Sequence, residues 1–266
     1  MRTWRNREME MERRLTTDIV KLPTLSDQTQ TSPNILDLAQ RWRSFRLHAL
    51  KTAPEAFAAS HEIESQHGIE KTIERLSSSK ATHFVALDST SPHGDTSHTP
   101  KRLDVLEAPW VGTIVLLGPL TDAGSTRITA TKDPFARVAA SDHVTGIETS
   151  TFQPANDGAV KNEILHYHLN GIAARGRGLG LALIQAALIE AAHWAKASDS
   201  KGFKATILVD DYNTAARQLY EKAGFVVVGR EVYEQQPRAL VEDEKARTER
   251  VALLMEHLRV IESPVT

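Results

Sequence analysis

The sequence predicts an α/β (α+β) protein with a central mixed β-sheet of about six to seven strands flanked by helices. From Glu163 onward, short apolar runs alternate with helical stretches in the order strand, helix, strand, helix, strand. A helical crossover places neighbouring strands parallel, which predicts a βαβ core. Upstream, apolar residues recur at helical spacing before two apolar strands. With 266 residues, 41% of them hydrophobic, the chain can bury one sizeable core.

Two helices and three strands are expected in the first part of the chain. Ile35–Thr52 carries apolar residues at helical spacing and is predicted as one helix. Ala53-Pro54 ends this helix, because a residue before proline disfavours the α region, while proline suits the first turn of another helix. The other expected elements are a helix at about 69–76 and strands at 18–22, 83–87 and 110–117.

The second part of the chain has sharper patterns. Gly178–Ala197 is a strongly amphipathic helix, and Ala205–Val209 is a fully apolar strand. A further helix, Asn213–Ala223, is followed by Gly224, which suits a left-handed cap. The charged segment 231–249 is predicted as a solvated loop or partial helix. The remaining strands are expected at 163–169, 225–228 and 251–258.

These elements predict a single domain over residues 17–260. Residues 1–16 mix both charge signs and are expected to form a disordered arm. Loop insertions are expected at about 88–109 and 119–160, from their polar, Gly- and Pro-containing composition. A loop as long as the second is uncommon in a compact domain, so it is either a mobile insertion or a lid over a site.

Composition excludes several classes of protein. The formal net charge of −2 gives no overall field for nucleic acid or an anionic membrane. With no cysteine, the chain has no disulfide, thiolate metal site or cysteine nucleophile, which fits a reducing compartment. The first residues lack the apolar core of a signal peptide, and the most apolar stretch, Leu179–Ala195, is broken by polar residues. We therefore expect a cytoplasmic protein, with the nucleus not excluded.

The sharpest local feature is the turn Arg175-Gly176-Arg177-Gly178-Leu179-Gly180, which follows a strand and opens a helix. The first backbone N–H groups of a helix lack partners and favour an anion, and glycines let a ligand approach closely. The turn therefore predicts a pyrophosphate cradle, with a plain glycine-rich turn as the alternative. Leu181-Ala182 follows where a Walker loop needs Lys and Ser or Thr, and leucines at 181 and 183 break the dinucleotide fingerprint.

Two motifs resemble the GNAT superfamily of N-acetyltransferases. Arg175-x-x-Gly178-x-Gly180 matches its Arg/Gln-x-x-Gly-x-Gly/Ala signature. Asn213-x-x-Ala216-x-x-Leu219-Tyr220-Glu221-Lys222-x-Gly224-Phe225 resembles its second coenzyme A motif, and residues 46–57 resemble the first helical region of many members. Over roughly 18–258, the resemblance implies the GNAT acyl-CoA N-acyltransferase fold and acetyl-CoA as cosubstrate. In one departure, the strand before the phosphate loop lacks the proline of many relatives.

The resemblance also implies catalytic residues. Tyr220 is expected to protonate the departing thiolate, because it lies two helical turns, about 10 Å, beyond Asn213 on the same helix face. Glu163 is expected as the general base, since some relatives use a glutamate at a similar place. His166 and His168, on the other face of that strand, and a chain of waters are alternatives. This histidine pair has no third ligand in sight, so no metal is expected.

Binding residues follow from the same resemblance. For the acceptor, Phe57, Trp110 and His168 are expected to line the cleft, with Glu55 beside them. The coenzyme is expected to contact Ile172, Arg175, Gly176, Arg177, Gly178, Leu179, Gly180, Leu181, Asn213, Ala216 and Tyr220.

The expected reaction is acetyl transfer from acetyl-CoA to a primary amine, on a small molecule or a protein, by direct attack in a ternary complex. No G-x-S-x-G motif and no thiol offer a covalent route. A catalytically weak or inactive module that binds or senses coenzyme A is the alternative. Neither nucleic acid nor a membrane is expected as a partner, and the protein is expected to be a monomer or a homodimer.

Overall fold

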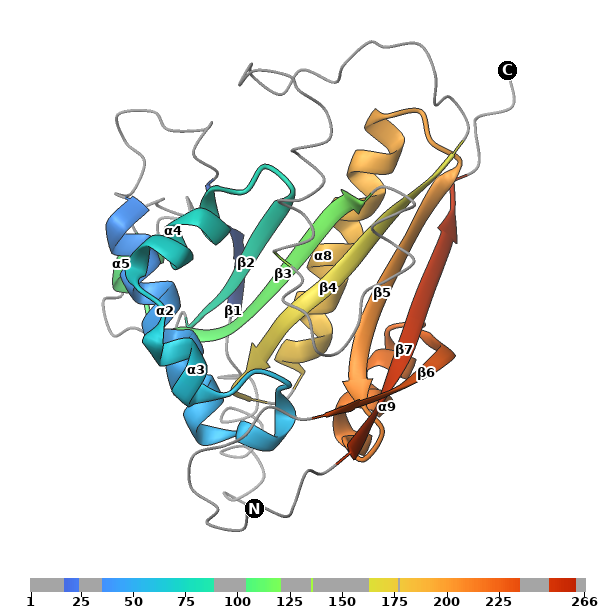
Figure 1. The fold of residues 1–266 in the computed structure, drawn as a ribbon. Helices are drawn as coiled ribbons and strands as arrows, with labels where there is room; N and C mark the ends of the chain where they lie inside the picture. Colours follow the sequence, from blue (N-terminus) through green and yellow to red (C-terminus); the bar gives the residue numbers. More distant parts are fainter. Residues whose placement is uncertain are drawn as a thin grey trace, which may run out of the picture.

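The computed structural model describes residues 17–23, 35–88, 104–120, 135, 163–176, 178–234 and 249–261. They form a seven-stranded sheet in the order β1-β2-β3-β4-β5-β7-β6, flanked by helices (Figure 1). The predicted fold class, a mixed sheet of six to seven strands with helices around it, is confirmed. The strands are β1 (Thr17–Lys21), β2 (Ala81–Asp88), β3 (Trp110–Leu120), β4 (Ile164–Ala174), β5 (Gly202–Asp210), β6 (Val226–Glu234) and β7 (Glu249–Val260).

Helices lie on both faces of the sheet. In Figure 1, α8 crosses behind the central strands, while the upstream helices lie in front of and beside β2 and β3. The helices are α2 (Ile35–Thr52), the 3₁₀ turn η2 (Pro54–Ala56), α3 (His61–Gln66), α4 (Ile69–Ser77), α5 (Asp104–Glu107), α8 (Leu179–Ala197) and α9 (Thr214–Lys222).

Most predicted elements are confirmed, and the differences have local causes. The helix 35–52 is confirmed at both ends. β4 runs on to Ala174, beyond the predicted end at Leu169; Gly171 has a φ of 62° there, and the register with β3 is irregular. β6 continues to Glu234, so the expected loop at 231–249 was wrong over its first residues. Helix α3 was not predicted; Ser60 caps it by accepting from the Ile63 N–H.

Some expectations lie outside the described residues. These are the arm 1–16, residues 89–103 of the first insertion, and nearly all of the second insertion. The short helix α5 occupies part of the first insertion. In the part of the chain that the structure describes, no helix is long and apolar enough to cross a membrane.

The sheet divides between β4 and β5. These two strands are parallel, and their register runs from Ile164 opposite Gly202 only as far as His168 opposite Thr206. Beyond that point β4 stays paired with β3 up to Ala174, and β5 stays paired with β7 up to Asp210. The facing edges of 169–174 and 207–210 therefore diverge, as Figure 1 shows at the lower ends of the two strands. We call this the β4–β5 divergence.

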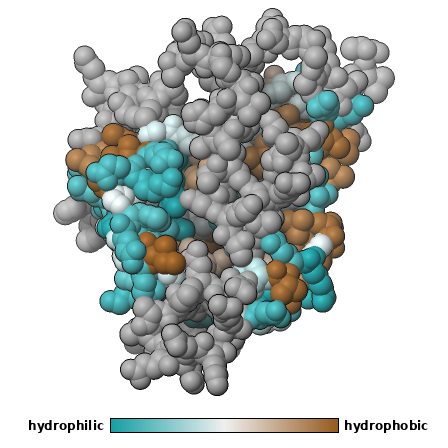
Figure 2. Space-filling view, in the orientation of Figure 1, coloured by the Kyte–Doolittle hydropathy of each residue, from teal (hydrophilic) through white to brown (hydrophobic). Residues whose placement is uncertain are grey.

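Apolar side chains form a core on each face. One core packs α8 and α9 against the sheet and includes Tyr167, Leu183 and Tyr220. The other lies under α2 and α4 and includes Trp42 and Trp110. Successive residues of β4 point to opposite faces, so Tyr167 enters the α8 core while its neighbour His168 faces the other side. Exposed apolar residues gather instead on β6 and β7, where Figure 2 shows brown patches.

Candidate functional site

The turn between β4 and α8 is an open helix start. Arg175 donates its N–H to the Val111 carbonyl at 2.7 Å, which holds the turn against β3. Gly178, at a φ of 85°, is the N-cap of α8 and makes no side-chain cap, and the Ala182 N–H reaches its carbonyl at 3.1 Å. The amides of residues 179–181 precede that bond, so they have no intrahelical acceptor. Such a start favours an anion.

The glycines of this turn have different roles. A Cβ on Gly178 would meet nothing within 4 Å, so the space beside this backbone is open, and its left-handed φ is what favours glycine. A Cβ on Gly180 would lie 2.7 Å from Leu219 Cδ2 of α9. Gly180 therefore lets α9 pack closely on α8, a role that the sequence motif did not indicate. Arg177, between them, lies outside the described residues.

Helix α9 begins with a filled cap. The Asn213 Oδ1 accepts a hydrogen bond from the Ala216 N–H at 3.1 Å. This cap occupies the carboxamide oxygen of Asn213 and leaves its NH₂ group as the part that can reach a ligand. Its expected contact with the coenzyme stays a prediction.

Tyr220 lies near the other end of α9 and is buried, with 7% of its surface exposed. Its ring lies 6.3 Å from that of Phe225, in the α8 core. Burial raises the pKa of its phenol above the ordinary value, because the charged form is poorly solvated there. The hydroxyl therefore keeps its proton at neutral pH, as a proton donor must.

His168 lies at the last paired position before the β4–β5 divergence. Its side chain is buried, and Nδ1 lies 3.1 Å from Thr206 Oγ1. The Thr206 hydroxyl donates its one proton to the Tyr167 carbonyl at 3.2 Å, so it accepts from His168. Hydrogen on Nδ1 makes Nε2 the basic nitrogen of the neutral ring. The sequence did not indicate Thr206, which is 38 residues away in the chain.

Glu163 lies at the opposite end of β4 from the phosphate turn. It is exposed, and its carbonyl accepts the Lys201 N–H at 3.1 Å where β4 and β5 are still paired. Glu163 is five residues before His168, roughly 17 Å along an extended strand. The structure thus places these two candidate bases apart.

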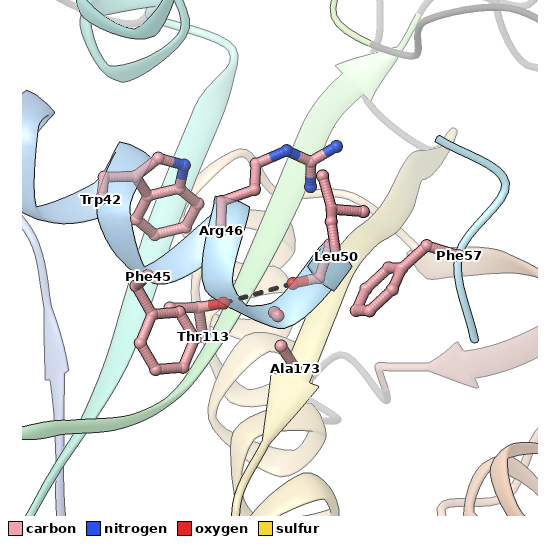
Figure 3. Close-up of a pocket in the computed structure, with 9 residues that line it drawn as sticks. Trp42, Phe45, Arg46, Leu50, Phe57, Thr113 and Ala173 are labelled. Atoms are coloured by element: carbon pink, nitrogen blue, oxygen red, sulfur yellow. Dashed lines mark hydrogen bonds between the residues drawn. The ribbon is translucent and has the colours of Figure 1, made fainter. Parts of the chain in front are cut away.

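The expected acceptor residues separate as well. Phe57 lines a narrow pocket between α2 and the strands β3 and β4 (Figure 3). Trp110 does not; it is buried under α2, where its Nε1 donates to the Val105 carbonyl at 2.8 Å. The pocket is lined by Trp42, Phe45, Arg46, Ala49, Leu50, Phe57, Thr113, Gly171 and Ala173.

One carboxylate neutralises charge beside this pocket. Glu64 on α3 lies 3.2 Å from the Arg46 Nε and also pairs with Arg75. Burial opposes the ionisation of Glu64, but the two guanidinium groups outweigh it and hold the pKa of the carboxyl below its usual range. Arg175 lies over the ring of Phe45, 5.6 Å from its centre, which connects the pocket wall to the phosphate turn.

A family comparison agrees with this arrangement. The model of the acetyltransferase (GNAT) family matches residues 165–225. Residues 165–225 are therefore similar to the GNAT family. The resemblance predicted from the phosphate turn and the α9 motif is therefore confirmed over the segment that holds both. A comparison with curated proteins gives no match.

Solved GNAT structures are similar at low identity. NAA60 of Arabidopsis thaliana, in complex with a bisubstrate analogue, is 13% identical with a TM-score of 0.47, covering 91% of this chain and 98% of that one. A GNAT acetyltransferase from Streptococcus pneumoniae is 15% identical with a TM-score of 0.47, covering 91% of this chain and 100% of that one. The spermidine N-acetyltransferase of Vibrio cholerae, in complex with CoA and spermine, is 13% identical with a TM-score of 0.47, covering 91% of this chain and 95% of that one. With TM-scores below 0.5, these likenesses add nothing to the family match and the sheet order.

Proposed function

We propose that the protein is an N-acetyltransferase that moves an acetyl group from acetyl-CoA to a primary amine by direct attack in a ternary complex. The observation that carries this proposal is the uncapped start of α8 beside the β4–β5 divergence. An open helix start can bind a pyrophosphate, and unpaired strand edges can bind the amide-containing arm that follows it. The family match over residues 165–225 supports the same reading.

Each end of the proposed coenzyme site has its own residues. Main-chain amides of 179–181, with Arg175, Gly176 and Gly178 shaping the turn, would hold the diphosphate. Ile172 lies on the diverging part of β4, where the pantetheine arm would pass. Asn213 and Ala216 would approach it from α9. Arg177 completes the expected set.

Tyr220 is proposed as the acid. Attack by the amine nitrogen forms the new C–N bond, and the C–S bond breaks as the tetrahedral intermediate collapses. The electron pair leaves with sulfur, which takes up the phenolic proton of Tyr220. Positioned proton donors of this kind contribute about 10²–10⁴ in rate. Burial raises the pKa of Tyr220, so the phenol is protonated at neutral pH.

Among the candidate bases, Glu163 lies just before β4 and His168 lies on it. Glu163 stays a proposal, and its exposed position at the paired end would require waters to relay the proton. His168 is supported by its place at the start of the divergence and by the tautomer that Thr206 sets. Glu163→Gln and His168→Gln separate the two: the base is the residue whose loss removes the acidic limb of the pH profile of kcat/KM for the amine.

A thiol-release screen tests the function. Acetyl-CoA is mixed with the protein and a panel of primary amines, and free coenzyme A thiol is measured. Release that depends on the amine supports the acetyltransferase. Tight acetyl-CoA binding without release for any amine would instead support the alternative, a module that senses coenzyme A.

Further expectations stay proposals. We place one domain at residues 17–260, with insertions at about 88–109 and 119–160. We also propose that the enzyme works in the cytoplasm, as a monomer or homodimer, without metal, membrane or nucleic acid; the lack of cysteine supports a reducing compartment.

A further inference from the structure

The pocket of Figure 3 adjoins the proposed transfer site. Gly171 and Ala173 form one wall, and both belong to the diverging part of β4. The opposite wall comes from α2 and from Phe57, whose ring points toward the pocket in Figure 3. Thr113 donates to the Gly171 carbonyl at 3.3 Å and fixes the floor. A group seated here lies beside the strand along which the acetyl donor would run.

The lining is apolar except at Arg46 and Thr113. Trp42, Phe45 and Phe57 contribute aromatic surface, and Ala49 and Leu50 contribute aliphatic surface. Such walls favour an apolar ligand group, because burial removes its surface from water. Of the nine residues that line this described pocket, one is charged, and it is the cation Arg46.

The charge beside the pocket remains positive. Glu64 is shared between Arg46 and Arg75, so these three residues together carry one positive charge. The Arg46 Nη1 lies 3.6 Å from where a Cβ of Gly171 would stand, so the guanidinium reaches over the pocket floor. A ligand cation in the pocket would be repelled at short range, where the effective dielectric constant is low.

A hydrogen-bonded cluster holds the segment that carries Phe57. The Tyr212 hydroxyl, from the loop after β5, lies 2.6 Å from the Glu55 carbonyl of η2 and 2.9 Å from Asp210 Oδ2, so its one proton is shared between these two acceptors. Arg250 pairs with Asp210 at 3.3 Å and also donates to Tyr212, while Tyr233 donates to the same carboxylate. Glu55 is two residues before Phe57, so this cluster ties the pocket wall to the other side of the β4–β5 divergence.

We infer that the acceptor is a primary amine whose neighbouring group is apolar and uncharged, that this group binds between α2 and β4, and that Arg46 excludes polyamines. The inference rests on the proposed acetyltransferase function. An arylalkylamine and a peptide with an apolar first residue share this chemistry. A polyamine keeps at least one further ammonium group when one nitrogen reacts, and that charge would face Arg46.

The test compares phenethylamine, a short peptide with amino-terminal methionine, and spermidine in the thiol-release assay with the full chain. The inference expects phenethylamine or the peptide to exceed spermidine in kcat/KM by at least about tenfold, the effect of one like charge at short range. Which of the two is better identifies the source of the acceptor. Spermidine as the best acceptor would overturn the inference and leave the acetyltransferase standing. If none of the amines causes thiol release, both the inference and the proposed acetyltransferase function are overturned.

Four variants locate the effect. Arg46→Gln should raise the ratio of kcat/KM for spermidine to kcat/KM for phenethylamine about tenfold, because it removes the cation of the pocket lining while Glu64 keeps Arg75. Arg43→Gln is the matched control: it removes the same charge from α2, where Arg43 binds the Ser65 and His67 carbonyls outside the pocket. Phe57→Ala should raise KM for phenethylamine about tenfold with kcat little changed, and Phe57→Leu should restore it.

The cluster gives a second readout. Tyr212→Phe removes the hydrogen bond to Glu55 and should raise KM for phenethylamine several-fold, while the Kd for acetyl-CoA stays constant. Equal shifts for Arg46→Gln and Arg43→Gln would show that overall charge, and not the pocket, sets the preference, and would overturn the inference.

Discussion

Two helices begin beside the proposed coenzyme site, and they begin differently. At α8 the N-cap is Gly178, which makes no side-chain cap and has open space where a Cβ would be. At α9 the N-cap is Asn213, whose side chain binds the Ala216 N–H. One helix start is completed by its own residue, and the other is left incomplete. An incomplete start can be completed by an anion, so the difference fits the proposed diphosphate site at α8.

The largest expected effect comes from filling the open start. Gly178→Glu places a carboxylate at the start of α8, where it would take the phosphate's position and repel it. We expect acetyl-CoA affinity to fall more than about 100-fold by calorimetry. Gly178→Ala is the matched control, since it imposes the same left-handed strain without charge. If both variants lose affinity equally, backbone strain and not charge explains the loss.

The next largest effect is expected from removing the Tyr220 hydroxyl on α9, the proposed proton donor. Tyr220→Phe should lower kcat by about 10²-fold with little change in the Kd for acetyl-CoA, since only the proton donor is lost. Because burial raises the phenol pKa, the wild-type kcat should show no alkaline loss from this group up to about pH 10. Unchanged turnover in the variant would remove Tyr220 from the role of acid.

Removing the side-chain cap at the start of α9 should lower the thermal stability of the protein. Asn213→Ala removes the cap of α9, worth about 1 kcal/mol, or about 2–4 °C in Tm for a protein of this size. Thermal unfolding measures this, and Asn213→Asp should keep the cap. A large loss of acetyl-CoA affinity in Asn213→Asp at normal Tm would show that the NH₂ group contacts the coenzyme.

The smallest effect is expected at Gly180. Gly180→Ala keeps the backbone N–H, and the added methyl meets the flexible tip of Leu219. The gain in helix propensity, about 1 kcal/mol, offsets the repacking, so stability and acetyl-CoA affinity should both change little. A marked loss of affinity would show that the close approach of α9 is needed to shape the site.

The sequence predicts local features of the site well and distant contacts poorly. The phosphate turn and the Asn213 helix are written in consecutive residues, so their motifs could be recognised. The contact of His168 with Thr206 joins two strands, and the contact of Tyr212 with Glu55 spans 157 residues, so neither leaves a local pattern. Trp110 was expected in the cleft because aromatic side chains suit both cores and binding sites, and only packing distinguishes them.

Because β4 and β5 separate after five register pairs, the sheet is really two antiparallel ribbons joined at one end. A linear molecule with alternating amide donors and acceptors, lying between them, would join the ribbons like a missing strand. Occupied protein would then behave as one continuous sheet, and the two ribbons would resist being pulled apart far better than in the empty form.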